Sequence, residues 1–263
     1  MPLTPFQQEL LKLLAANRSP DSFMAGGTVL NATADSLRFS KDLDIFHDAQ
    51  ASVLECAERD AETLSGHGCA VEWLRRFETF HRARVSRQEL QVLLEWSHDS
   101  AFRFFPVEAD LVCGYRLNLF DAATNKVLAL MGRVEPRDYL DTLHLHKHHL
   151  SLGALAWAAA GKDPGVNPVF IVEQAKRNAH YRPEDFARIN LAVPLDLVGW
   201  SREWREAVEQ ALALAVALPA EEVGCLYLNE QNIPVTPDPA SPDFAKLRRH
   251  FGSVRGAWPV IRE

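Results

Sequence analysis

Residues 24–46 read MAGGTVLNATADSLRFSKDLDIF. Near the end of this run acids alternate with apolar residues, just as the side chains of a strand alternate between its two faces. Asp42 and Asp44 are therefore expected on one face, while Leu43 and Ile45 point into the core. Two carboxylates so close together repel each other unless a cation binds them. Hard oxygen ligands of this kind suit Mg²⁺ or Mn²⁺, which bind one or two carboxylates together with water and substrate phosphates.

A glycine turn precedes the acidic strand. Gly26 and Gly27 would let a phosphate approach bare backbone N–H groups, and Thr28 adds a hydroxyl at the expected start of a helix. The sequence thus predicts a phosphate site and a metal site in one place. Taken separately, the glycines also suit an ordinary turn, and the acid pair also suits a solvated edge strand.

The composition is that of an ordinary globular protein. Of 263 residues, 47% are apolar and 24% are charged, enough for one large domain or two modest ones. No apolar run has the length of a membrane span and the first residues do not resemble a signal peptide, so we expect a cytoplasmic protein without membrane partners. The net charge of −7 argues against nonspecific coating of nucleic acid. The scattered cysteines indicate neither a zinc site nor a disulfide framework.

Periodicity and capping residues predict the order of elements. A strand is expected at 22–25, and two longer strand-like runs at 71–85 and 90–97 form an antiparallel hairpin across a polar turn. Asp121 is expected to cap the helix that follows. The predicted helices span residues 6–14, 28–37, 60–66, 122–131, 136–150, 152–160, 168–179, 183–190 and 201–218.

A second informative run, residues 125–141, reads NKVLALMGRVEPRDYLD. Lys126 and Arg133 could hold phosphate oxygens, the arginine in a bidentate manner. The alternative is a surface lysine and an arginine that offsets a helix dipole. Asp138 and Asp141, one turn apart on a helix, could orient these cations, bind an acceptor, or simply be favourable acids of a first turn; a site role is marginally favoured for Asp141.

Together these motifs carry a resemblance. Gly-Gly-Thr followed by Asp-x-Asp resembles the signature of the DNA polymerase β-like nucleotidyltransferase superfamily. The later order of Lys, Ala-Leu, Arg and Arg-Asp-x-x-Asp resembles the AbiEii/AbiGii toxin family, bacterial nucleotidyltransferases of toxin–antitoxin and phage-defence systems that include the MenT enzymes. The resemblance covers about residues 20–145. It implies an α+β fold with a nucleotidyltransferase-type mixed β-sheet flanked by helices, followed by a C-terminal helical bundle.

The superfamily also places a third acid on a strand after the acid pair. Glu95 is an isolated acid on an apolar strand and is our choice, with Glu108 and Asp110 as the next candidates; a lone strand acid is otherwise usually just solvent-facing. The resemblance implies three groups of site residues. The metal ligands are Asp42, Asp44 and Glu95; the catalytic set adds Asp141; the residues that bind the nucleoside triphosphate (NTP) are Gly26, Gly27, Thr28, Lys126 and Arg133.

The implied reaction is metal-dependent transfer of a nucleoside monophosphate from an NTP to an acceptor hydroxyl, with release of pyrophosphate. The family further implies a toxin that modifies RNA, with tRNA 3′ ends as the acceptor and a cognate antitoxin protein as partner. Two alternatives stay open: an acceptor that is a small molecule or a protein, and a nucleotide-binding regulator that has lost catalysis. The sequence leaves open which NTP is used and the oligomeric state.

Three domains are expected: a catalytic domain over 1–122, a helical domain over 123–225 that completes the active-site cleft, and an extended proline-rich tail over 226–263. The tail carries a short basic helix near 244–251, and its basic residues favour only weak contact with RNA phosphates. The histidine-rich run 144–149 could place two rings on one helix face, but no partner ligand completes a metal site. The basic residues of the tail are Lys246, Arg248, Arg249, Arg255 and Arg262.

Overall fold

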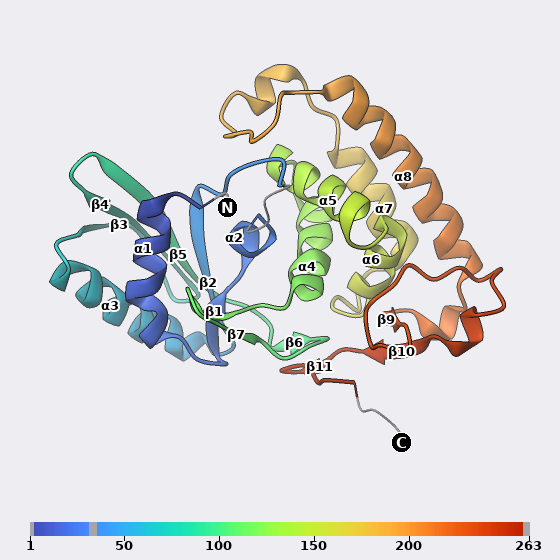
Figure 1. Cartoon of the computed structure of the whole chain (residues 1–263), viewed down its shortest axis with the longest axis horizontal. Coiled ribbons are helices and arrows are strands. Elements are labelled where there is room, and N and C mark those ends of the chain that lie inside the picture. Colours follow the sequence, from blue (N-terminus) through green and yellow to red (C-terminus); the bar gives the residue numbers. More distant parts are fainter. Residues whose placement is uncertain (1–2, 32–35, 260–263) are drawn as a thin grey trace. The chain divides into compact units, whose positions relative to one another are not determined.

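The computed structural model describes residues 3–31 and 36–259, and Figure 1 shows the order of its elements. The chain divides into two compact units. The first consists of Met1–Ala101 and Pro106–Ala122, and the second of Phe102–Phe105 and Ala123–Glu263. The proline-rich segment from residue 226 onward falls within the second unit. Arg262 of the basic tail and residues 32–35 of the expected second helix lie outside the described residues.

A seven-stranded mixed sheet forms the centre of the first unit, in the order β3-β4-β5-β2-β1-β8-β7. Strand β2 is antiparallel to β1 and parallel to β5, and β3, β4 and β5 are consecutive antiparallel neighbours. With its flanking helices this sheet confirms the predicted α+β fold with a mixed sheet. The strands are β1 (Ser22–Met24), β2 (Asp42–His47), β3 (Ala70–Phe77), β4 (Phe80–Arg87), β5 (Leu90–His98), β7 (Glu108–Asp110) and β8 (Gly114–Arg116).

The single strand expected over 71–85 is wrong, because two strands occupy this run. Phe77 pairs with Phe80 across a two-residue turn, Glu78-Thr79, and β3 folds back on β4. The turn contains no glycine, asparagine or proline, so the usual local signal of a hairpin is missing.

Two helices bury one face of this sheet. Helix α1 (Pro5–Leu14) begins with a capping box between Thr4 and Gln7, and α3 (Gln50–Gly66) contacts β2, β3, β4 and β5. Their apolar positions join those of the strands in one core. Its members include Phe6, Leu10, Leu14, Leu43, Ile45, Val53, Ala57, Leu64, Leu94 and Trp96.

A buried polar contact ties α3 to the sheet beneath it. The Asp60 carboxylate accepts a hydrogen bond from Trp96 Nε1 at 2.7 Å and a charged one from Arg18 Nη2 at 2.6 Å. Asn17 Nδ2 donates to the same carboxylate at 2.8 Å. A buried carboxylate needs such partners, and here they come from the segment after α1 and from β5. The contact therefore fixes the position of α3 relative to the sheet.

Helix α2 (Gly26–Leu30) is shorter than expected. Asn31 is its C-cap residue: the backbone N–H makes the last helical hydrogen bond, to the Gly27 carbonyl at 2.9 Å, and the side-chain Nδ2 donates to the same carbonyl at 2.8 Å. An asparagine that bonds the backbone in this way competes with continuation of a helix.

Helices make up most of the second unit, which confirms the predicted helical region after the sheet. One cap was predicted wrongly: the helix begins before Asp121, and the Asn118 side chain accepts the Phe120 N–H at 2.9 Å instead. The expected helix over 183–190 is reduced to a 3₁₀ turn, Pro183–Phe186. The helices are α4 (Leu119–Gly132), α5 (Pro136–His148), α6 (Leu152–Ala159), α7 (Pro168–Asn178) and α8 (Leu197–Ala217).

The basic helix expected near 244–251 is wrong as well. A 3₁₀ turn, Phe244–Lys246, leads into strand β10 (Arg248–Phe251), which pairs antiparallel with β9 (Cys225–Leu228). A second small pair joins β11 (Ser253–Val254) to β6 (Phe102–Arg103). Among the described residues, no helix is both long and apolar enough to cross a membrane.

Candidate active site

The two acids of β2 lie on one half-buried face of the first unit's sheet. Leu43 and Ile45 alternate with them and are fully buried in the core. The alternation read from the sequence therefore places Asp42 and Asp44 side by side along the strand, on the face turned away from α3.

The Asp44 carboxylate lies directly against the glycine turn. Gly26 has a φ of +59°, which L-residues rarely adopt, and a Cβ built on it would lie 2.1 Å from Asp44 Oδ2. The backbone supports the same approach, because the Ala25 N–H donates to the Asp44 carbonyl at 2.9 Å. Glycine at this position thus leaves space that the acid occupies.

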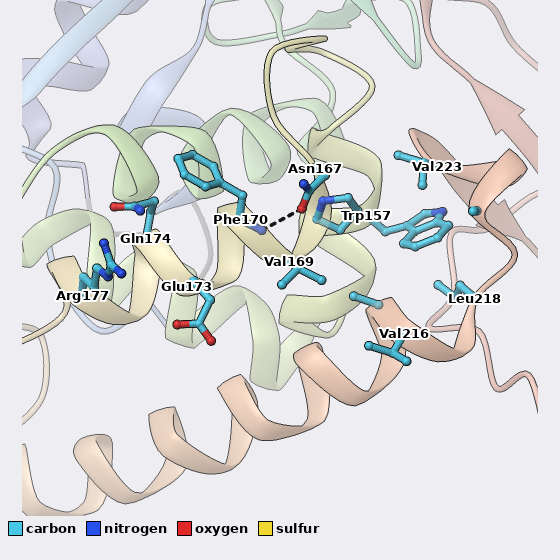
Figure 2. Close-up of a pocket in the computed structure, with 13 residues that line it drawn as sticks. Trp157, Asn167, Val169, Phe170, Glu173, Gln174, Arg177, Val216, Leu218 and Val223 are labelled. Atoms are coloured by element: carbon cyan, nitrogen blue, oxygen red, sulfur yellow. Dashed lines mark hydrogen bonds between the residues drawn. The ribbon is translucent and has the colours of Figure 1, made fainter.

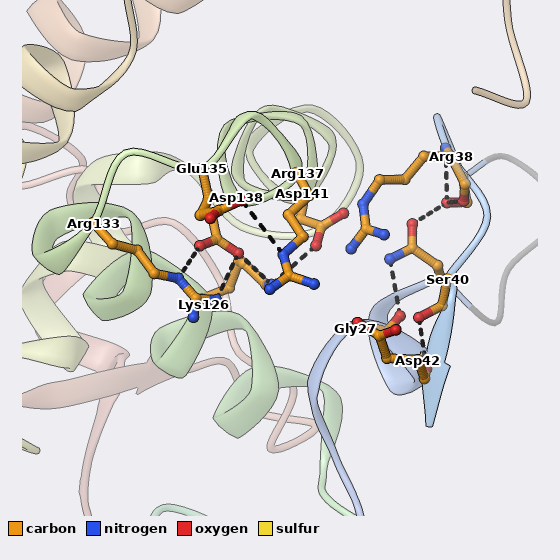
Figure 3. A network of polar contacts seen from close by, with 12 residues as sticks. Gly27, Arg38, Ser40, Asp42, Lys126, Arg133, Glu135, Arg137, Asp138 and Asp141 are labelled. Atoms are coloured by element: carbon orange, nitrogen blue, oxygen red, sulfur yellow. Dashed lines mark hydrogen bonds and ion pairs between the residues drawn. The ribbon is translucent and has the colours of Figure 1, made fainter. Parts of the chain in front are cut away.

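Two hydroxyls hold the start of β2. Thr28 Oγ1 donates to the Asp42 carbonyl at 2.9 Å. Ser40 Oγ donates to the same carbonyl at 3.0 Å (Figure 3). Thr28 is buried, so its hydroxyl joins α2 to β2 rather than standing exposed for a phosphate. Its contribution is to keep the glycine turn and the acidic strand in register.

Glu95 lies directly beside Asp44. The two residues are partners in the parallel register of β5 with β2, and Glu95 is half-buried like the β2 acids. Its carboxylate accepts a hydrogen bond from Arg82 Nε on β4 at 2.6 Å. The other two candidates, Glu108 and Asp110, are on β7 at the opposite edge of the sheet, with β8 and β1 between them and β2. Strand order therefore brings Glu95 to the acid pair and keeps Glu108 and Asp110 away.

The acid pair of β2, and not all three acids together, suits a cation that is shared with a substrate. Asp42 and Asp44 project from one strand face, whereas the Glu95 carboxylate is engaged by Arg82. Within residues 3–31 and 36–259, no three His, Cys, Asp or Glu side chains gather closely enough to hold a metal ion. Mg²⁺ commonly binds through one or two carboxylates plus substrate phosphates, and β2 supplies such a pair.

Arg38 is a neighbour of the glycine turn that the sequence reading did not select. It is buried, and a Cβ on Gly27 would lie 2.8 Å from its Nη2 atom. The guanidinium of Arg38 therefore lies against the bare backbone of Gly27. The only local signal is a basic residue shortly before the acid pair, which is too common in sequences to be selected.

In the second unit, Lys126 and Arg133 converge on one carboxylate (Figure 3). Lys126 Nζ contacts Asp138 Oδ1 at 2.7 Å and Asp141 Oδ2 at 3.1 Å, while Arg133 Nε donates to Asp138 Oδ2 at 2.7 Å. Burial by itself raises the pKa of Asp138. The Lys126 charge and the hydrogen bonds from both cations outweigh this effect and hold the pKa below its ordinary value. Asp138, ranked below Asp141 from the sequence, is thus the residue that contacts both cations.

The histidine-rich run and the basic tail have local contacts of their own. The His144 and His148 rings lie 4.6 Å apart, centroid to centroid. In the tail, Arg249 Nε contacts Glu222 Oε1 at 2.8 Å, and Lys246 contacts Asp243 at 2.6 Å. These two basic groups of the tail are therefore already paired with acids of the same unit.

The second unit also contains an open groove of about 890 Å³ between α7 and the end of α8 (Figure 2). Trp157, Val169 and Val216 give it an apolar lining, and Glu173 and Arg177 add one charge of each sign. It has no acid pair like that of β2, so we place the proposed chemistry at β2 and not in this groove.

The seven-stranded mixed sheet and the helices after it make up an α+β fold like that of MenT-type nucleotidyltransferase structures. The structure is similar to MenT4, a nucleotidyltransferase toxin from Mycobacterium tuberculosis, with a TM-score of 0.57 and 19% identity over 82% of this chain and 83% of that one. It is also similar to a protein from Helicobacter pylori described as a candidate nucleotidyltransferase, with a TM-score of 0.53 and 19% identity over 82% of this chain and 99% of that one. No protein-family model and no curated protein matches the chain. At these identities the similarity establishes the fold, which agrees with the fold that the motifs predicted.

Proposed function

We propose that this protein is a metal-dependent nucleotidyltransferase that transfers a nucleoside monophosphate from an NTP to an acceptor hydroxyl. The observation that carries the proposal is the acid pair of β2. Asp42 and Asp44 share one strand face, and Asp44 pairs in register with Glu95 and lies against the glycine turn, in a fold shared with MenT4. An edge strand with solvated acids does not explain this arrangement, because β2 is a central strand between β1 and β5.

Asp42 and Asp44 would hold Mg²⁺ or Mn²⁺, and the backbone of Gly26 and Gly27 would receive the triphosphate. A bound divalent cation would neutralise phosphate charge and stabilise the leaving group. The acceptor oxygen forms a bond to the α-phosphorus, the bond from that phosphorus to the bridging oxygen breaks, and pyrophosphate leaves. Asp44 or Glu95 accepts the proton of the attacking hydroxyl.

Lys126 and Arg133 are proposed as further phosphate ligands. Asp138 contacts both cations and Asp141 contacts Lys126, so these two acids act as positioning residues that set the direction of the ammonium and guanidinium groups. An arginine oriented by a carboxylate has its guanidinium plane in a fixed direction, and a guanidinium suits bidentate contact with a phosphate.

The acceptor that we propose is the 3′ end of tRNA, in a toxin of a bacterial toxin–antitoxin or phage-defence system with a cognate antitoxin. Support comes from the order of the sequence motifs and from the similarity to MenT4, whose description is that of a nucleotidyltransferase toxin. If the protein is such a toxin, expression of the wild type in bacteria arrests growth, whereas expression of the Asp42→Asn variant does not.

The direct test incubates the protein with each labelled NTP, Mg²⁺ and total bacterial RNA. We expect label in tRNA, and none in tRNA whose terminal 3′-hydroxyl has been replaced by hydrogen. Asp42→Asn and Asp44→Asn should each lower the rate by at least about a hundredfold, because loss of a direct metal ligand exceeds the usual effect of an outer-shell change.

The matched control is Glu72→Gln, which removes an exposed β3 acid paired with Arg84 and should leave the rate unchanged. Label in a small molecule or a protein, with none in RNA, would support the nucleotidyltransferase activity but refute tRNA as the acceptor. Absence of transfer to every acceptor class, with Asp42→Asn indistinguishable from wild type, would refute the proposed activity.

A further inference from the structure

The first unit contains a pocket of about 600 Å³ between the start of α3 and the β3–β4 turn. Arg82 of β4 reaches Glu95, and side chains alternate along a strand, so the neighbouring His81 is on the opposite face from the acids. The pocket is therefore separate from the proposed active site. Its lining residues are Gln50, Ala51, Leu54, Arg76, Phe77, Glu78 and His81.

His81 is the unusual member of this lining. Only 4% of its surface is exposed, and neither ring nitrogen has a hydrogen-bond partner within the described residues. The Trp73 and His81 rings form a T-shaped contact, with centroids 6.0 Å apart. Burial lowers the pKa of His81, helped by the charge of Arg76 and opposed by that of Glu58, so the ring is neutral at pH 7. A buried neutral imidazole whose N–H has no acceptor is costly, and an acceptor that enters the pocket can take this hydrogen bond.

The N-terminus of α3, which lines the same pocket, also has backbone N–H donors without a side-chain cap. Helix α3 has 17 residues, and its N-cap residue, Ala49, supplies no side-chain acceptor for the first turn. The first N–H groups of a helix have no partner within the helix, and their dipoles favour an anion. Gln50 and Ala51, which carry such N–H groups, line the pocket.

The rim combines one cation, one acid and two apolar side chains. Arg76 contacts Glu58 at 2.6 Å and stacks over Trp73 at 4.8 Å, which holds its guanidinium near the opening. Glu78 adds a negative charge, which disfavours a dianion such as a phosphate monoester. Leu54 and Phe77 are 44% and 59% exposed, which is unusual for side chains of this size that line one hollow.

We propose that this pocket binds an organic carboxylate that carries an apolar group. The carboxylate accepts hydrogen bonds from the α3 first turn and from His81, and the apolar group packs against Leu54 and Phe77. Two sources offer this chemistry: a free aromatic acid, and the C-terminal residue of a peptide. Both place one negative charge next to one apolar side group, and the experiment distinguishes them.

The experiment titrates the ¹⁵N-labelled full-length protein with four probes while the amide signals of Gln50 and Ala51 are followed. Phenylacetate tests the free acid and 2-phenylethanol is its neutral counterpart. N-acetylphenylalanine tests the peptide C-terminus and its amide is the neutral counterpart. We expect saturable shifts of both signals with at least one acid, and at least about tenfold weaker binding of its neutral counterpart, since a hydrogen bond to a charged group is worth that factor or more. The acid that binds identifies the source.

His81→Leu should weaken binding of that acid by about tenfold, while His81→Gln, which keeps a donor, should bind within about threefold of wild type. The control is His67→Leu, because His67 is exposed and outside the lining. Unchanged melting temperatures establish that each variant is folded. Shifts that never saturate, neutral probes that bind as tightly as the acids, or a folded His81→Leu variant with wild-type affinity would overturn the proposal. No NTP is present, so the result is independent of the proposed transferase activity.

Discussion

Replacement of Gly26 by alanine tests the link between the glycine turn and the acid pair. The added Cβ would lie 2.1 Å from Asp44 Oδ2, whereas real Cβ contacts are essentially never below 3.0 Å. The carboxylate oxygen must therefore move by at least 0.9 Å, the difference between these two distances. Because a side-chain terminus can rotate, the cost in stability is modest, but the acid leaves the position in which we propose it holds the metal.

The expected magnitudes follow from this geometry. An L-residue in the left-handed region costs roughly 1–2 kcal/mol of folding free energy. A misplacement of about 1 Å in a catalytic group costs on the order of a hundredfold in rate. Gly26→Ala should therefore lose about 1–2 kcal/mol of stability and about a hundredfold in nucleotidyl transfer, with a parallel loss of Mn²⁺ affinity in the presence of NTP.

Gly68→Ala is the matched control. Gly68 also has a left-handed φ, +77°, but a Cβ there would meet nothing within 4 Å. It should show a similar loss of stability in urea unfolding and full activity. If Gly26→Ala and Gly68→Ala retained equal activity and Mn²⁺ affinity, the proposed role of Asp44 beside the turn would be refuted.

Three further substitutions test buried contacts within the individual units. His47 is fully buried, and burial and the nearby Arg18 charge lower its pKa to about 4. In the unfolded chain the pKa of this histidine is near 6.5, so the unfolded state binds the proton at a higher pH than the folded state does. The free energy of unfolding therefore falls as the pH drops from about 6.5 to about 4, by up to about 3 kcal/mol at 1.36 kcal/mol per pH unit. Urea unfolding of His47→Gln should lack this pH dependence. Asp138→Asn should lower unfolding free energy by up to about 3 kcal/mol, because it leaves a buried Lys126 with one carboxylate instead of two. Gly161→Ala should cost about 1–3 kcal/mol by thermal unfolding, since its Cβ would lie 2.5 Å from the Gly224 carbonyl oxygen.

Each of these changes has a control elsewhere in the chain. His67→Gln, at an exposed histidine, should keep the wild-type dependence of unfolding free energy on pH. If His47→Gln also kept that dependence, the proposal that His47 is buried as a neutral ring would be contradicted. Asp243→Asn breaks an exposed pair with Lys246 and should leave unfolding unchanged; an equal effect in Asp138→Asn would argue against the buried cluster. A Cβ added at Gly132, at a helix end, would meet nothing within 4 Å, so Gly132→Ala should leave stability unchanged or raise it. If Gly161→Ala behaved in the same way, the close approach of the Gly161 and Gly224 backbones would be contradicted.

Local patterns were sufficient for much of the fold and for the acid pair. The alternation of Asp42-Leu43-Asp44-Ile45 depends only on the period of a strand, and its buried and half-buried positions lie where that period places them. Helix α1 was predictable for the same reason, because a capping residue, an N-terminal proline and apolar periodicity are all read within one short segment.

The sequence by itself therefore determined the acid pair, the glycine turn, the class of fold and the helical nature of the second unit. Tertiary structure decided the rest, because strand order and side-chain partners depend on residues far apart in the chain. Glu95, rather than Glu108 or Asp110, lies beside Asp44 only because β5 pairs with β2. Residues 248–251 form a strand and not a helix because β9, some twenty residues earlier, is there to pair with them. Pairing of this kind is a nonlocal gain in hydrogen bonds and packing, and it outweighs the weak local preference that a single segment expresses.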